Sequence, residues 1–189
     1  MKKIFIPKVM ALFFLMANTF FANAQKKKNS HLKKIIIQKV KKISPLDSLT
    51  NLLKGNLVLP FEGCNISMPY GLCKMESNTI YQNPGITFSA KASKKVRAAW
   101  DGVVSRISII DDMYVVIIRC GQLFFAYANL EKPMVAVNQH LSKGQFIGNL
   151  HRDDTGYFST DFLLSAKDQI NPTNWFDWNG SKNMIMARK

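Results

Sequence analysis

The stretch DGVVSRISIIDDMYVVIIRCGQLFFAYANL, residues 101–130, decides the fold. It holds three apolar runs that are rich in Val, Ile and aromatic residues. Short polar turns separate the runs at Asp111-Asp112 and Cys120-Gly121, and Gly102 opens the first run. Runs of β-branched and aromatic residues bounded by Asp and Gly are typical of strands joined by tight turns. The stretch therefore predicts three consecutive antiparallel strands.

Shorter runs of the same kind continue on both sides of this stretch. They are NLVLPFEG (56–63), CNISMPYG (64–71), GITFSA (85–90), VRAAW (96–100), FIGN (146–149) and YFSTDFLLSA (157–166). Strands at this spacing, joined by Gly and Asp turns, favour an all-β fold, an antiparallel β-sheet or a β-sandwich-like domain. Upstream, SPLDSLTNLLKG (44–55) predicts one short helix that ends at Gly55.

The N-terminus has the pattern of a secretory signal peptide. Lys2 and Lys3 precede an apolar run that is too short to span a membrane, and a small-x-small cleavage site ends at Ala24. We therefore expect an exported protein, periplasmic or associated with the cell envelope, with no transmembrane segment after cleavage. The expected organisation is a signal peptide (1–24), a basic N-terminal arm or linker (25–55) and a folded domain (56–189).

Positive charge is concentrated in the arm. Residues 26–54 carry nine Lys and one acidic residue, a net charge of +8, whereas residues 55–189 carry a net charge of +3. Such an arm is either a solvated linker or a tether to an anionic envelope surface, such as phospholipid heads or an envelope polymer. Export argues against nucleic acid as a partner.

The chain has three cysteines, Cys64, Cys73 and Cys120. An oxidising compartment permits a disulfide. Cys64 and Cys73 are near in sequence and flank a turn-like SMPYG, so they are the expected pair. Cys120 would then be a free thiol that packs as a small apolar side chain.

Two of the expected strands place polar side chains on apolar faces. Neighbouring residues of a strand alternate between its two faces. In YFSTDFLLSA this puts Ser159 and Asp161 on one face, and a carboxylate within a strand core needs a specific reason. In QLFFAYANL (122–130), Asn129 is expected on the face of Phe125 and Tyr127. A rigid sheet with a few convergent polar atoms is typical of a binding site.

The ordered series of motifs resembles the LytM-type domain of the M23 metallopeptidase family. The similarity rests on EGCNISMPYG, DGVV, YVVII, YANL, VNQHLSKGQFIG and INPTNWF, and it covers about residues 58–176. Members of this family cleave peptide bonds in bacterial cell-wall peptidoglycan with one zinc ion. The resemblance implies an antiparallel β fold and a site built from a His-x-Gly-x-Asp motif, a His-x-His strand and a Tyr-x-His-Leu strand end.

Every histidine of that family site is replaced in this sequence. NPGIT places Asn83 and Thr87 at the first motif, and STD places Ser159 and Asp161 at the two histidines of the second. Asn129 stands at the histidine of the strand end. One carboxylate with neutral oxygens is a poor zinc ligand set. The resemblance therefore implies a degenerate groove formed by these five residues, with no zinc or other cofactor and no catalytic residue.

Loss of the metal removes the chemistry of the family. Zinc lowers the pKa of bound water from about 15.7 towards 7, which corresponds to roughly 12 kcal/mol of ionisation free energy. No other group in the sequence supplies that ionisation free energy. We therefore expect an inactive homologue that binds cell-wall peptide or peptidoglycan, or that regulates a cell-wall hydrolase.

Two other functions stay open at this point. His151, with Asp153, Asp154 or Asp161, could rebuild an atypical metal site in an active peptidoglycan endopeptidase. Alternatively, the chain is a structural module of the envelope in which the basic arm does the binding. Metal analysis would test the first alternative, and deletion of residues 26–54 would test the second.

Overall fold

The computed structural model describes residues 45–74 and 78–179. The predicted signal peptide and residues 25–44 of the arm lie outside these ranges. Within them, one α-helix, α2 (Pro45–Leu53), precedes a series of strands. Gly55 follows this helix with a left-handed φ of 80°, which is typical of a residue that ends a helix. The prediction of an antiparallel all-β domain with a short helix is confirmed.

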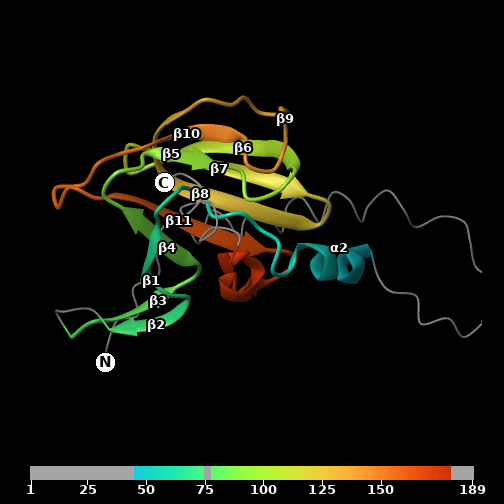
Figure 1. Ribbon diagram of the computed structural model, residues 1–189, viewed down its shortest axis with the longest axis horizontal. Coiled ribbons are helices and arrows are strands. Elements are labelled where there is room, and N and C mark those ends of the chain that lie inside the picture. The colour runs from blue at the N-terminus through green and yellow to red at the C-terminus, as the bar shows by residue number, and fades with distance from the viewer. Residues whose placement is uncertain (1–44, 75–77, 180–189) are drawn as a thin grey trace, which may run out of the picture.

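Ten of the described strands form one sheet (Figure 1). Its main path, in spatial order, is β1 (Asn65–Met68), β4 (Ile86–Ala90), β11 (Phe158–Ser165), β8 (Leu123–Pro133), β7 (Met113–Cys120), β6 (Gly102–Ile110) and β9 (His140–Leu141). Neighbours along this path are antiparallel. The three runs of residues 101–130 are therefore consecutive hairpin strands, as the sequence predicts.

The remaining elements extend this framework. Strand β10 (Phe146–Leu150) pairs with both β8 and β5 (Lys95–Arg97), and β12 (Gln169–Ile170) pairs with β11. A separate hairpin consists of β2 (Gly71–Lys74) and β3 (Ile80–Asn83). A single 3-10 turn, η1 (Thr173–Trp175), follows β12. No helix among the described residues is long and apolar enough to cross a membrane.

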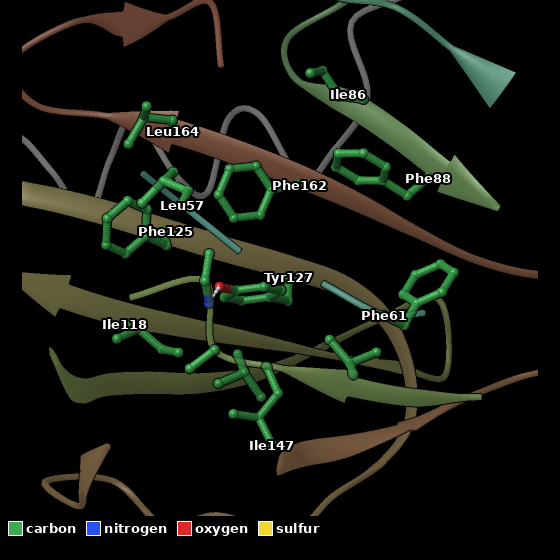
Figure 2. Close-up of a cluster of buried hydrophobic side chains, with 14 of the residues drawn as sticks. Leu57, Phe61, Ile86, Phe88, Ile118, Phe125, Tyr127, Ile147, Phe162 and Leu164 are labelled. Atoms are coloured by element: carbon green, nitrogen blue, oxygen red, sulfur yellow. Dashed lines mark hydrogen bonds between the residues drawn. The ribbon is translucent and has the colours of Figure 1, made fainter. Parts of the chain in front are cut away.

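The main hydrophobic core lies on one face of the sheet. Figure 2 shows Phe125, Tyr127 and Phe162 among the side chains gathered there, and the Phe162 ring lies 5.2 Å from the Tyr127 ring. The Tyr127 hydroxyl accepts a 2.7 Å hydrogen bond from the backbone N–H of Ala99. Leu53 of α2 is buried in the same cluster, so the end of the helix packs against the sheet domain.

A second, smaller apolar cluster lies on the opposite face. It follows from strand alternation, because every second residue of β7, β8 and β11 points away from the main core. Its members are Val115, Ile117, Phe124, Ala126, Ala128 and Leu163, with Ile110 packed against them. The central strands are therefore apolar on both faces.

Two local expectations are corrected. Residues 56–63 form no strand. Leu57 makes an isolated bridge to Phe176, Val58 donates a backbone hydrogen bond to Ala99, and Phe61 is buried in the main core. The predicted Cys64–Cys73 disulfide is not formed, because the two thiols lie in different surroundings. Cys64 is buried in the main core, and burial raises its pKa to about 11. Cys73 lies on β2, where its Sγ donates a hydrogen bond to the carbonyl oxygen of Pro69.

Candidate polar groove on strands β4, β8 and β11

The register of two neighbouring strands joins Thr87 and Asp161. Asp161 of β11 lies directly opposite Thr87 of β4, and opposite residues of an antiparallel pair have Cβ atoms about 5 Å apart. The Thr87 hydroxyl donates a 2.7 Å hydrogen bond to Asp161 Oδ1. Two positions that lie far apart in the sequence therefore form one polar contact on the face that carries Leu163.

Asn129 joins the same contact, on a different face from the one expected. The register between β7 and β8 shifts between Tyr114 and Val116, which marks a β-bulge. Asn129 lies at this bulge with a left-handed φ of 63°, a conformation that Asn tolerates better than most residues. Bulges redirect side chains. The Asn129 amide consequently donates to Asp161 Oδ2 at 3.4 Å instead of following Tyr127 into the core.

Asn83 and Ser159 do not hydrogen-bond to this cluster. Asn83 is buried, and its amide donates to the carbonyl oxygens of Met68 and Pro69 at 3.2 and 3.0 Å. Its Oδ1 accepts from the backbone N–H of Gly85. Asn83 therefore fixes the turn between β1 and β2 against the start of β4. Ser159, half-buried opposite Ser89, has no side-chain hydrogen bond to a described residue.

The electrostatics of the cluster are set by burial. Burial raises the pKa of Asp161, while the hydrogen bonds from Thr87 and Asn129 lower it. Burial and the negative charge of Asp161 also raise the pKa of Tyr81 on β3. Tyr81 therefore belongs to the surroundings of Asp161, which the sequence analysis missed. The available signal was its position two residues before Asn83, on the strand that leads into the first family motif.

The donor set of the cluster does not fit zinc. Thr87, Asn129 and Asp161 offer one carboxylate and two neutral groups, and both neutral groups donate to that carboxylate. Zinc in proteins takes His, Cys and carboxylate ligands. No group of three or more His, Cys, Asp or Glu side chains among the described residues could hold a metal ion. We therefore derive no step through a metal.

The alternative set around His151 is not assembled either. His151 is exposed. Asp153 Oδ1 accepts hydrogen bonds from the backbone N–H groups of Thr155 and Tyr157 and from the Thr155 hydroxyl. These bonds lower the pKa of Asp153, and they hold its carboxylate in the turn before β11. Within the described residues, this arrangement favours a structural role for Asp153.

Comparison with known proteins supports the family assignment of the sheet domain. Residues 81–168 match Peptidase family M23. No curated protein sequence matches this chain significantly. The resemblance to LytM-type M23 domains, drawn from the order of the motifs, is confirmed.

Solved structures show the same fold at low identity. A chain of the SpoIIQ–SpoIIIAH pore-forming complex is 20% identical over 69% of this chain and 97% of its own length, with a TM-score of 0.53. Csd3 of Helicobacter pylori is 20% identical over 70% of this chain, with a TM-score of 0.51, and the match spans 39% of Csd3. A zinc-containing peptidase of Vibrio cholerae is 16% identical over 63% of this chain and 38% of its own, with a TM-score of 0.51.

Proposed function

We propose that this protein is an exported, non-catalytic M23-type domain that binds cell-wall peptide or peptidoglycan. The observation that carries the proposal is the hydrogen bonding of Asp161. This carboxylate stands at the position of a family zinc ligand, and its two oxygens accept bonds from Thr87 and Asn129. Neutral donors stabilise the carboxylate in the way that a cation otherwise would.

A site without hydrolytic chemistry can still bind a peptide. Leu163 and Ala126 beside the Asp161 cluster are buried, whereas Thr87, Asn129 and Asp161 are half-buried and keep some exposed surface. A few polar groups placed on a rigid framework are typical of ligand sites. The retained M23 framework therefore supports recognition of the peptide that the family cleaves, without its cleavage.

The structural comparisons favour one further ligand class. A protein with this fold is found in complex with a second protein, in the SpoIIQ–SpoIIIAH assembly. On that basis, regulation of a cell-wall hydrolase by direct binding is the second candidate function. The basic arm, with its net charge of +8 over residues 26–54, supports additional contact with an anionic envelope surface.

Three measurements on the purified exported protein test the proposal. We expect retention on isolated peptidoglycan sacculi, no stoichiometric zinc by metal analysis and no release of wall fragments. Stoichiometric zinc together with wall degradation, abolished by His151→Ala or Asp161→Ala, would establish the active alternative. The proposal would be overturned if the protein were not retained on sacculi and no hydrolase were recovered with it.

A variant without residues 26–44 separates the domain from the arm. If the sheet domain binds the wall, this variant is retained on sacculi and Asp161→Ala is not. The opposite pattern would show that the arm carries the interaction and that the groove does not.

A further inference from the structure

The second apolar cluster, on the face of the sheet opposite the main core, is buried. Its six side chains are no more than 8 % exposed. Among the partly buried apolar residues that the structure describes, only Ile110 packs against it. Helix α2 packs in the main core instead. Where a face of an antiparallel sheet meets water, every second residue is usually polar. The apolar, buried face therefore indicates a covering segment outside the described residues.

The centre of this cluster is a row of side chains across three strands. Ile117 of β7 lies opposite Ala126 of β8, and Ala126 lies opposite Leu163 of β11. Neighbouring strands lie about 4.8 Å apart, so the row is about 10 Å wide. A helix with its side chains is about 10–12 Å across. One segment of chain is therefore enough to cover the row.

Two stretches of the exported chain could supply this segment, because removal of the predicted signal peptide leaves the arm and residues 180–189. The second stretch contains Met184, Ile185 and Met186. It follows Trp178, which packs against the main core and donates a 3.0 Å hydrogen bond to the carbonyl oxygen of Thr173. Residues 180–189 therefore leave the domain from the opposite face of the sheet, which favours the arm.

The arm joins the domain close to the cluster. Leu49 of α2 lies next to Gly121 in the turn between β7 and β8, and Pro45 begins this helix about 6 Å away along its axis. Ile117 lies four residues before Gly121, about 13 Å along β7. The nine residues from Ile36 to Pro45 span at most about 30 Å when extended. Ile36 can therefore reach the row.

The arm also has the side-chain pattern that such a face requires. Leu32, Ile36, Val40 and Ile43 recur every three or four residues, which gives a helix one apolar side. Ile36 and Val40 would share a side in an extended strand as well, whereas Ile37 would not. Lysines lie between these positions, at 33, 34, 39, 41 and 42. Lysine stems cover apolar surface while their ammonium groups stay in water.

Charge also favours this placement. Asp161 lies two residues before Leu163 on β11 and so borders the row on the same face. Its two hydrogen-bond donors among the described residues, Thr87 and Asn129, are neutral. The arm carries a net charge of +8 over residues 26–54. A lysine brought near this carboxylate supplies an opposite charge.

We propose that the arm docks on the second apolar cluster, with Ile36 and Val40 packed over the row formed by Ile117, Ala126 and Leu163. Docking removes apolar surface from water on both partners, and this stabilises the contact. The arm is then part of the folded domain, and only its lysines face outward. The inference goes beyond the proposed function, since it concerns a contact within the chain and holds whether or not the domain binds the wall.

Hydrogen exchange of the exported protein, followed by mass spectrometry, tests this inference. We expect the amides of residues 34–42 to exchange about tenfold more slowly, or better, than those of residues 26–32 in the same chain. Ile36→Asp should abolish this difference and increase the binding of a fluorescent apolar dye, because the cluster becomes exposed. Ile37→Asp is the matched control, one residue away and with the same chemistry, and it should change both readouts much less.

Several outcomes would overturn the inference. They are equal exchange of residues 34–42 and 26–32, equal effects of Ile36→Asp and Ile37→Asp, or strong dye binding by the unchanged protein, which would show an open face. Dye binding that increases in Ile185→Asp and not in Ile36→Asp would identify the C-terminal stretch as the cover. A dimer by light scattering, with the cluster protected in Ile36→Asp, would identify a second copy. Retention on sacculi is a separate measurement and bears only on the proposed function.

Discussion

Replacing Thr87 by Val tests the central contact of the Asp161 cluster. The substitution keeps the shape of the side chain and removes the hydroxyl that donates the 2.7 Å bond to Asp161 Oδ1. A hydrogen bond to a charged group contributes about 1.5–3 kcal/mol. Both side chains are half-buried, so we expect a loss near the lower end, about 1.5 kcal/mol at pH 7.5. In a domain of this size that corresponds to a melting temperature lower by about 3–6 °C.

The effect should depend on pH with a defined sign. Burial raises the folded-state pKa of Asp161 above its unfolded value, and the Thr87 bond lowers it. The stability contribution of Asp161 therefore falls as pH rises from the unfolded pKa through the folded one. Without the Thr87 bond the folded-state pKa of Asp161 is higher. The loss of stability with rising pH therefore continues over a wider pH range. The difference between wild type and Thr87→Val should be smallest near pH 4 and largest above neutrality.

Urea denaturation followed by circular dichroism at pH 4.5 and pH 7.5 measures this difference. Ser159→Ala is the matched control, because it removes a hydroxyl from the same face that makes no side-chain hydrogen bond to a described residue. It should shift the midpoint little at either pH. Thr87→Val with wild-type midpoints at both pH values would refute the reasoning, as would a larger effect at the lower pH.

Three further outcomes follow from the core and the thiols. Tyr127→Phe should lower the free energy of unfolding by about 1–3 kcal/mol in urea, because a fully buried N–H loses its acceptor; an unchanged midpoint would contradict this. Iodoacetamide at pH 8 should modify Cys73 well before Cys64, because burial raises the pKa of the Cys64 thiol to about 11. Equal modification rates of the two thiols by mass spectrometry would contradict this prediction. Gly85→Ala should cost about 1–3 kcal/mol or more in thermal unfolding, since the new Cβ overlaps the backbone carbonyl of β11, and wild-type stability would exclude that overlap.

The sheet could be predicted from the sequence because its strands obey alternation closely. The runs of residues 101–130 became β6, β7 and β8 in consecutive antiparallel order. The contact between Thr87 and Asp161 could be predicted only from the resemblance to the M23 motifs, because that resemblance places both residues at one site. Alternation alone says which face Asp161 occupies and nothing about its partner on β4.

The errors arose where local backbone or tertiary contacts overrode the pattern. Asn129 does not lie on the expected face, because a β-bulge and a left-handed φ redirect its side chain. The alternation of residues along a strand predicts neither feature. Asn83 was grouped with the groove, although its amide bonds two carbonyl oxygens of the preceding turn. The cysteine pair was predicted from nearness in sequence alone, whereas both thiols are free, with Cys64 buried and Cys73 half-buried. The proximity of Tyr81 to Asp161 depends on how the β2–β3 hairpin folds against the sheet.

The packing of α2 fixes the point from which the arm departs. Leu49 of this helix approaches Gly121 at the β7–β8 turn, and Leu53 is held in the core. Figure 1 shows α2 at one end of the long axis and the β2–β3 hairpin towards the other. If lysines upstream of Pro45 bind an anionic layer, α2 is the first described element that follows them along the chain. The packing of Leu49 and Leu53 would then transmit any pull on the arm directly to the sheet domain.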